Sequence, residues 1–427
     1  MKALQAFHLL RQGATILTAI LLAKSYLSTE AIGAYEQLLY IGYTISFFWV
    51  SGLIQGLLTS YSDYDPARKQ DFLFNAYVLF TGIGLVFFVL LWLFDEPALR
   101  LFTGKEELRY FRLFLVYILV NMPTYLVENF YLLFRQPRRI LQFGLFSFGG
   151  HLVVMLSPVF AGLPFIYSFY GLVGLAMVKH GWLLYLLRRY GRWRFSGALI
   201  RQWVVLSLPL MGYTLLGGLM QTFDNWLVNY WYNGNERQFA VFRYGARELP
   251  LALALAHAFN TAMLPEIRED IPKALRDIRR KSRQLFHLLF PLSVVLMLSS
   301  HWFFPLVFNP NFSESVPIFN TYLLILFSRL VFSRTVLVGL QDNQVVLIIS
   351  VVELLVNIGC SFWLIRDYGL VGVAMATVVA YALEKVLICG YLFYRHRIAP
   401  GTYLDGYWWG GYTAALLAAY WTSLTLG

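Results

Sequence analysis

Runs of about twenty apolar residues recur from one end of the chain to the other, and they limit its fold more than any other feature. A helix needs about 20 apolar residues to cross the hydrocarbon core of a bilayer. Only 13% of the 427 residues are charged, about half of the roughly 25% found in soluble domains. The sequence therefore predicts an all-α polytopic membrane protein.

We predict thirteen transmembrane spans. The last one also fits an interfacial or re-entrant piece, because it is short and starts with the glycine-containing stretch Gly406–Gly411. The predicted spans lie near 5–27, 32–60, 71–94, 108–134, 139–160, 166–188, 201–231, 238–264, 284–306, 315–340, 344–365, 370–394 and 407–426.

Basic residues are distributed unevenly over the connectors between these spans. One alternating set of connectors carries eighteen Arg and Lys residues, and the other set carries four. Cytoplasmic loops carry the excess of positive charge, so we place the first set and the N-terminus in the cytoplasm. Most of the net charge of +11 then reflects topology, and we expect no nucleic-acid partner.

One phrase occurs twice: residues 170–178 read YGLVGLAMV and residues 368–376 read YGLVGVAMA. Each copy begins the sixth span of a set of six, so both halves start on the same side of the membrane and form parallel repeats. We expect a six-helix lobe over 1–196, a second over 197–397, and a separate piece over 398–427 that can be a thirteenth helix. The glycines of the phrase should let neighbouring helices approach closely: 171, 174, 369 and 372.

The sequence contains none of the common catalytic motifs. G-x-x-x-x-G-K-[ST], H-E-x-x-H and G-x-S-x-G are all missing, and the two cysteines, Cys360 and Cys389, lie in apolar runs. We therefore predict a transporter and not an enzyme, with no catalytic residues, no metal site and no cofactor other than a coupling H⁺ or Na⁺.

Basic residues inside spans are costly, so they usually line a cavity or pair with acids. Arg243 and Arg247 are four residues apart and would share one face of a helix. A phosphate or pyrophosphate in a water-filled cavity would neutralise them, and the alternative is snorkelling or a salt bridge with Asp224 or Glu36. The candidates for substrate binding are Arg247, Arg243, Lys24, Lys179 and Arg11.

Acidic residues inside spans are the candidates for ion coupling or structural pairing. Asp224 lies mid-span, where a carboxylate would protonate, bind a cation or pair with an arginine such as Arg247. Glu36 and Glu128 join it in this group. We also expect Arg329 or Arg334 to pair with Glu353 on the following span.

The segment Pro265–Gln284 alternates apolar residues with Arg and Lys. This spacing fits an amphipathic helix on the cytoplasmic membrane surface. A charged loop that only orients the protein explains it equally well.

Four stretches carry a resemblance to a known family: AKSYLSTEAIGAY (23–35), SLPLMGYTLLGGLMQTFDNWLVNYW (207–231), LVFNPNFSESVPIFNTYLLIL (306–326) and YGLVGVAMATVVAYALEKVL (368–387). The chain resembles the polysaccharide flippases, the O-antigen or Wzx-like transporters, of the multidrug/oligosaccharidyl-lipid/polysaccharide (MOP) exporter superfamily. Lys24 matches the family's basic residue at the end of helix one, and Asp224 its acid on helix seven. Asn225 departs from the basic residue that often follows that acid.

The resemblance implies two six-helix lobes around a V-shaped central cavity that work by alternating access. The implied cargo is an undecaprenyl-pyrophosphate-linked oligosaccharide, moved from the inner to the outer leaflet of the bacterial inner membrane. The expected partners are this lipid-linked oligosaccharide and membrane lipids, and contacts with polysaccharide assembly proteins are left open.

Two other functions are weighed against this one. A cation-coupled drug or metabolite exporter of the same superfamily should place unpaired acids in its cavity, whereas the candidates here are mostly basic. A membrane-embedded polysaccharide enzyme would need a large external loop, and the longest one, about 95–107, is too short for that.

Overall fold

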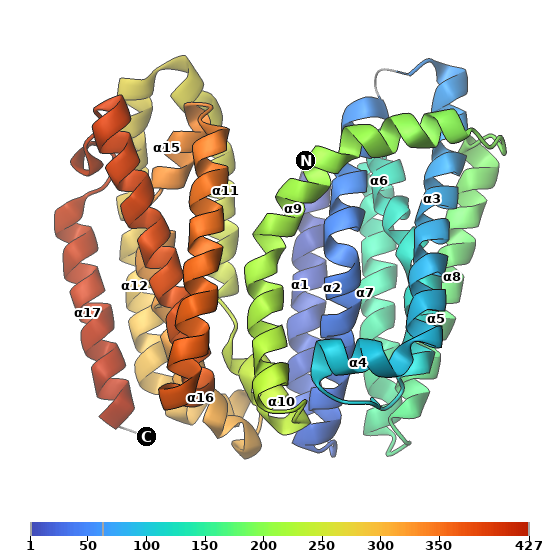
Figure 1. Ribbon diagram of the computed structural model, residues 1–427, viewed down its shortest axis with the longest axis horizontal. Coiled ribbons are helices and arrows are strands. Elements are labelled where there is room, and N and C mark those ends of the chain that lie inside the picture. The colour runs from blue at the N-terminus through green and yellow to red at the C-terminus, as the bar shows by residue number, and fades with distance from the viewer. Residues whose placement is uncertain (1, 62–63, 426–427) are drawn as a thin grey trace. The chain divides into compact units, whose positions relative to one another are not determined.

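The structure is a computed structural model that describes residues 2–61 and 64–425, and these residues form helices and no strand (Figure 1). The all-α prediction is therefore confirmed. The α-helices are α1 (Lys2–Ala23), α2 (Thr29–Ser60), α3 (Pro66–Leu93), α4 (Asp95–Thr103), α5 (Phe111–Asn121), α6 (Leu126–Leu133), α7 (Pro137–Phe160), α8 (Ile166–Tyr190), α9 (Gly197–Trp231), α10 (Glu236–Gly245), α11 (Pro250–Glu269), α12 (Ile271–Val307), α13 (Val316–Leu323), α14 (Ile325–Arg329), α15 (Ser333–Gly339), α16 (Asn343–His396) and α17 (Gly406–Thr425). Short 3-10 turns are η2 (Met122–Tyr125), η3 (Pro310–Ser315) and η4 (Pro400–Thr402).

Nine helical segments of the described chain are long and apolar enough to cross a membrane, or ten if the bent pair Pro310–Arg329 and Ser333–Gly339 forms one span. These numbers are lower than the thirteen predicted spans. The predicted spans 238–264 and 407–426 correspond to α10 with α11 and to α17, which are not among the segments that qualify. Residue 426 lies outside the described residues.

Helix α16 accounts for two of the predicted spans. Its 54 residues would measure about 80 Å as one straight helix, far more than the roughly 30 Å of a hydrocarbon core. The backbone leaves the helical conformation at Gly369, with φ 55°. Asn357 before this break donates a hydrogen bond to the hydroxyl of Thr377 after it, at 3.3 Å. Helix α16 is therefore a hairpin of two spans (Figure 1).

Large apolar side chains cover the outside of these helices. Trp302 is 72% exposed and Leu306 75% exposed, and many other apolar side chains of the long helices are also uncovered. Surfaces this apolar are not stable in water, whereas a helix satisfies its own backbone hydrogen bonds in lipid. The chain is a multi-pass membrane protein.

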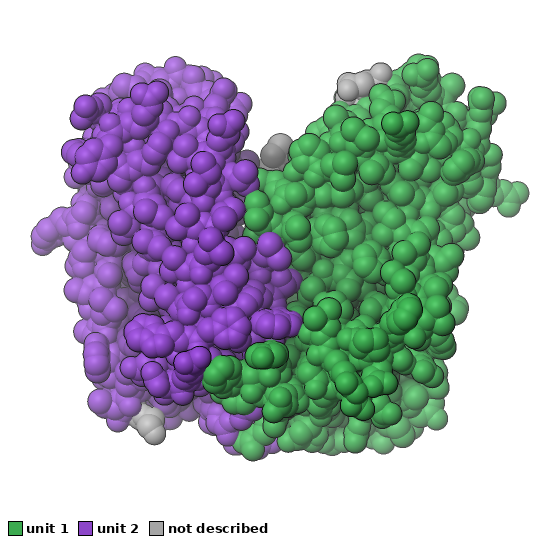
Figure 2. All heavy atoms as spheres, viewed as in Figure 1, with its two compact units in different colours: residues 1–218, 229–237 green, residues 219–228, 238–427 purple. Residues whose placement is uncertain are grey.

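Contacts divide the chain into two compact units, each shown in its own colour in Figure 2. Unit 1 comprises Met1–Gly218 and Asn229–Arg237, and unit 2 comprises Leu219–Val228 and Gln238–Gly427. Helix α9 contributes residues to both. The predicted six-helix lobes, 1–196 and 197–397, and the separate piece 398–427 stay predictions, because such contacts do not define where a repeat ends.

Unit 1 is built on α7, which packs against α1, α6 and α8, while α5 packs against α3 and α8. The first half of α9 joins this unit through Trp203, which is fully buried and donates a hydrogen bond to the carbonyl of Leu53 at 3.1 Å. Gly52 on α2 allows the close approach, because a β-carbon there would lie 2.7 Å from the Cα of Met211 on α9.

Unit 2 is built on α12 and α16. Helix α12 packs against α11 and α17, and α16 packs against α13, α14 and α15. Two of its predicted spans are broken. Helix α10 ends at Gly245 and α11 starts at Pro250, since a proline cannot donate a backbone hydrogen bond and disfavours a helical residue before it. A continuous helix over 238–264 was therefore a wrong prediction. The second break, between Arg329 and Ser333, bends the chain by 45°.

The basic segment Pro265–Gln284 is not a separate helix. It consists of the end of α11 and the start of α12, and Asp270 stands between them. The Asp270 carboxylate accepts a hydrogen bond from the backbone N–H of Lys273 at 3.0 Å, which makes it the N-cap of α12.

The glycines of the repeated phrase serve different purposes. A β-carbon at Gly171 would lie 2.8 Å from the Cβ of Val154 on α7, so Gly171 permits close helix packing as predicted. Gly174 has nothing within 4 Å of that position, and the packing role predicted for it is wrong. Gly369 has a positive φ, and Gly372 lies against the backbone of Leu364 across the hairpin turn of α16.

We predict that Gly171→Leu destabilises the protein by about 1–3 kcal/mol, because overpacking a close helix contact forces backbone shifts. The matched variant Gly174→Leu should unfold at the wild-type temperature. Thermal unfolding of both proteins in detergent measures the difference, and equal midpoints for the two variants would contradict the α7–α8 contact.

Candidate substrate and ion sites

Asp224 lies on α9 within unit 2 and is only 4% exposed. One of its carboxylate oxygens, Oδ2, accepts a hydrogen bond from the hydroxyl of Thr377 at 2.8 Å. Asn357 donates to the same hydroxyl from the other half of the α16 hairpin. Asp224 therefore connects α9 with both halves of α16, and we call Asp224, Asn357 and Thr377 the Asp224 site.

Several oxygen atoms at the Asp224 site are buried and accept no hydrogen bond from any described residue. They are Oδ1 of Asp224, Oδ1 of Asn357 and, one turn further along α16, the hydroxyl of Ser361. Buried polar atoms without partners are costly. Carboxylate, carboxamide and hydroxyl oxygens are the ligands preferred by hard cations, and a proton on Asp224 would also reduce the charge.

The expected ion pair between Asp224 and Arg247 does not form: within the described residues, no basic side chain reaches the Asp224 carboxylate within ion-pair distance. The expectation failed because it assumed that 238–264 is one helix. Arg247 lies instead in the break between α10 and α11.

The spacing of Arg243 and Arg247 predicted that they share one face of a helix, and this prediction is wrong. Arg243 is in the last turn of α10, and Arg247 follows the end of that helix. The Nε of Arg247 donates a hydrogen bond to the carbonyl of Arg243 at 3.1 Å, and its guanidinium lies 4.9 Å from the ring centroid of Tyr244. The two arginines remain neighbours because the chain turns at Gly245.

Three of the predicted site residues interact electrostatically in unit 1. Glu128 on α6 is buried, and it interacts with Arg11 on α1, which is exposed, and with Lys179 on α8. Helix α7, which packs against all three helices, carries His151, which interacts electrostatically with Lys179. We call Arg11, Glu128 and Lys179 the unit 1 cluster. It holds two cationic side chains and one carboxylate.

The remaining predicted site residues lie on the first two helices. Lys24 follows the end of α1, where its backbone N–H donates to the carbonyl of Ile20 at 3.1 Å, and its side chain is exposed. Glu36 is buried on α2. Next to it, Gln37 donates to the Oδ1 of Asn229 at 2.7 Å and to the carbonyl of Gly234 at 3.0 Å, which ties α2 to the end of α9.

A second group of charges gathers at the helix breaks of unit 2. Arg329 pairs with Glu248, and Arg334 donates to Glu384 at 3.1 Å. Glu384 also accepts from Lys385 at 2.6 Å. The expected ion pair of Arg329 or Arg334 with Glu353 does not form among the described residues, although both arginines interact with Glu353 electrostatically, because the breaks after Gly245 and Arg329 bring other carboxylates closer. We call these five residues the unit 2 cluster: Glu248, Arg329, Arg334, Glu384 and Lys385.

A cavity of about 180 Å³ opens next to the unit 2 cluster. Arg329, Arg334, Glu384 and Lys385 line it together with Asn260. These residues are not among the predicted site residues, and the two arginines were expected to form structural pairs. The charges inside the predicted spans 315–340 and 370–394, Arg329, Arg334, Glu384 and Lys385, are the signal that indicates a polar cavity here.

The fold matches solved structures over its whole length. It matches "Lipid II flippase MurJ, inward closed conformation" with a TM-score of 0.73 and 14% sequence identity, covering 99% of this chain and 98% of that one. The chain has a fold that solved MOP superfamily transporters share. An inward-facing multidrug resistance MATE family transporter of the MOP superfamily matches with a TM-score of 0.68 and 13% identity, covering 95% of both chains.

A third match is a MOP superfamily transporter from Pyrococcus furiosus that is described as having a binding pocket of reverse polarity. Its TM-score is 0.57 and its sequence identity 15%, and the match covers 97% of this chain and 95% of that one. No protein-family model and no curated protein matches the sequence. The fold is thus that of two-lobed membrane transporters, and the solved structures that it resembles are flippases and transporters and not enzymes.

We predict that Glu384→Gln lowers the stability of the protein by about 2 kcal/mol, because the variant removes the buried negative charge that Arg334 and Lys385 pair with. Glu384 is 1% exposed and serves both Arg334 and Lys385.

The matched control for this variant is Glu107→Gln at an exposed position, which should leave the unfolding midpoint unchanged. If the two variants unfold together with the wild type, Glu384 does not hold the unit 2 cluster in place.

Proposed function

We propose that this protein moves an oligosaccharide carried on a polyprenyl pyrophosphate from the inner to the outer leaflet of the bacterial inner membrane. The unit 1 cluster is the observation that carries the proposal. Arg11, which is exposed, and Lys179 both interact electrostatically with the single carboxylate of Glu128, and an excess of positive charge within membrane spans is costly unless an anion neutralises it.

A pyrophosphate fits this need better than a neutral or cationic cargo. Its oxygens accept paired hydrogen bonds from the N–H groups of a guanidinium, and they also attract the compact charge of an ammonium. The two cations of the unit 1 cluster lie on different elements, Arg11 on α1 and Lys179 on α8. The polyprenyl chain can stay in the bilayer, because it is as apolar as the lipid tails. The similarity in fold to a structure titled as a lipid flippase supports this choice of cargo class.

We further propose that the cycle is one of alternating access and that H⁺ or Na⁺ at the Asp224 site couples to it. A cation there would satisfy the buried oxygens of Asp224 and Asn357 that accept no hydrogen bond from described residues. Binding would also stabilise the contact between α9 and the α16 hairpin, which Thr377 now provides. An ion that binds one arrangement of these helices more tightly than another shifts their equilibrium.

A cation-coupled exporter of drugs or metabolites is the second candidate, and the similarity in fold to a multidrug resistance transporter favours it. The two functions differ in the charge of the cargo. An exporter of cationic drugs gains nothing from Arg11 and Lys179, whereas an exporter of pyrophosphate-linked sugars depends on them.

We predict that a strain lacking this protein accumulates its lipid-linked oligosaccharide on the inner leaflet, and that Lys179→Gln and Arg247→Ala each fail to restore export. Loss of one charge-assisted hydrogen bond costs about 1.5–3 kcal/mol, which reduces transport about tenfold or more. Extraction and mass spectrometry of the accumulated lipids measure this and identify the sugar.

The matched control for these variants is Arg366→Ala, an exposed arginine at the turn of α16, which should restore export fully. Normal surface polysaccharide in cells that carry Lys179→Gln and Arg247→Ala, at wild-type protein levels, would refute the anionic cargo.

Asp224→Asn provides a separate prediction for coupling. In proteoliposomes the wild-type rate should rise severalfold when a gradient of Na⁺ or H⁺ is imposed, and the rate of Asp224→Asn should not respond. Asp367→Asn, an exposed carboxylate at the same hairpin turn, should respond like the wild type. A gradient response that survives in Asp224→Asn would exclude this site from coupling.

A further inference from the structure

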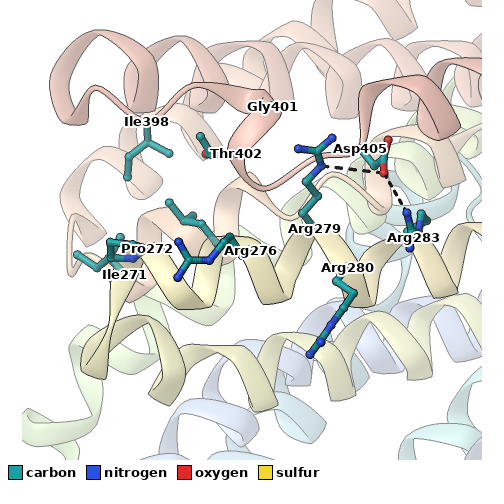
Figure 3. A pocket seen from close by; sticks show the side chains of 11 residues that line it. Ile271, Pro272, Arg276, Arg279, Arg280, Arg283, Ile398, Gly401, Thr402 and Asp405 are labelled. Atoms are coloured by element: carbon teal, nitrogen blue, oxygen red, sulfur yellow. Dashed lines mark ion pairs between the residues drawn. The ribbon is translucent and has the colours of Figure 1, made fainter.

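A second and larger cavity, of about 630 Å³, lies in unit 2 between the start of α12 and the segment that follows α16 (Figure 3). Four arginines of α12 line one side. The segment after α16 contributes the other side through Ile398, Thr402 and Asp405. None of these residues belongs to the clusters described above. The arginines are Arg276, Arg279, Arg280 and Arg283.

The charges of this cavity are only partly neutralised. Asp405 lies 3.7 Å from the Nη1 of Arg283 and 4.0 Å from the Nε of Arg279, and Figure 3 shows both arginines directed toward it. Arg280 pairs with Asp277 at 2.8 Å. Arg276 forms no hydrogen bond or ion pair with any residue that the structure describes. Four guanidinium groups and two carboxylates leave a local charge of about +2.

The position of the cavity along α12 matches the headgroup level of a membrane. The 37 residues of α12 span about 55 Å, about 25 Å more than a hydrocarbon core, so one end of the helix extends beyond it. Trp408 lies against the ring of His287, with 4.7 Å between their centroids, and Tyr412 accompanies them. Aromatic groups of this kind mark the membrane interface.

The arginines continue outward from this aromatic group. Arg283 lies one helical turn, about 6 Å, beyond His287, and Arg276 lies about 16 Å beyond it. The headgroup region extends about 5–8 Å beyond the hydrocarbon core on each side, so Arg283 lies at its depth, and long arginine side chains further out can extend back toward it. The same end of α12 is on the surface for which the distribution of basic residues predicts a cytoplasmic location.

We propose that this cavity binds the phosphodiester headgroup of an anionic phospholipid of the cytoplasmic leaflet. The guanidinium groups of Arg276 and Arg279 would donate paired hydrogen bonds to the phosphate oxygens. The apolar wall of Leu275 and Ile398 would cover the uncharged part of the headgroup. Bound lipid would connect α12 to the segment before α17. This site is independent of the cargo proposed above.

The test is native mass spectrometry of the full chain, purified in detergent and incubated with phosphatidylglycerol or with phosphatidylcholine. The wild type should retain phosphatidylglycerol in preference to phosphatidylcholine. Arg276→Gln with Arg279→Gln should lower the affinity for phosphatidylglycerol about a hundredfold, since two charge-assisted donors are lost. Arg138→Gln with Arg139→Gln removes the same charge from exposed positions at the start of α7 and should retain the lipid.

Three outcomes would overturn the proposal. Equal loss of lipid in both double variants would mean that only the overall surface charge attracts lipid, and no loss in either would mean that the arginines of the cavity do not bind it. A third arm uses inorganic phosphate alone. If millimolar phosphate displaces phosphatidylglycerol completely, the cavity is a site for a soluble anion and not for a lipid headgroup. Thermal unfolding of each variant confirms that the compared proteins are folded.

Discussion

The cost of placing a charge inside a bilayer governs the interior of this protein. Each ionisable group within the helices has to meet an opposite charge, a hydrogen-bond partner or a ligand. The unit 2 cluster meets the requirement internally, through Arg329 with Glu248 and through Glu384 with its two cations. The unit 1 cluster and the Asp224 site do not meet it completely. Both clusters hold one more cation than carboxylates, but only the unit 2 cluster joins its charges in ion pairs among the described residues, and the Asp224 site leaves buried oxygens without donors from described residues. We therefore propose that the cargo binds at the unit 1 cluster and the coupling ion at the Asp224 site.

Breaks in the helices make these arrangements possible. The chain leaves the helical path after Gly245 and again after Arg329, and the ion pair of Glu248 with Arg329 connects the two breaks. Irregular backbone is tolerated within a membrane where protein or a water-filled cavity surrounds it. These two breaks thus bring the charged residues of the unit 2 cluster together.

Much of the fold could be predicted from the sequence, because spans are set by local hydrophobicity and length. The hairpin of α16 was anticipated as two spans on either side of a turn near Gly369, where the glycine allows a positive φ. The partners of the buried charges could not be predicted. Asp224 and Thr377 are 153 residues apart. Helical spacing placed the side chain of Arg247 on the same face as that of Arg243, and the break after Gly245 changes the direction of the Arg247 side chain. The positions of side chains on a helix follow from their spacing only while the helix continues. Pro250 alone did not show that α10 ends at Gly245.

Leaflet-to-leaflet movement of a pyrophosphate-linked sugar lipid by the purified protein is the most direct measure of this account. Proteoliposomes would contain undecaprenyl-pyrophosphate-linked N-acetylglucosamine with a fluorescent label on the sugar, and a membrane-impermeant quencher would report the fraction on the outer leaflet over time. The account predicts rapid movement of this lipid and none of the same sugar on an uncharged polyprenol. Equal movement of both lipids, or movement of a cationic drug with neither lipid transported, would contradict it.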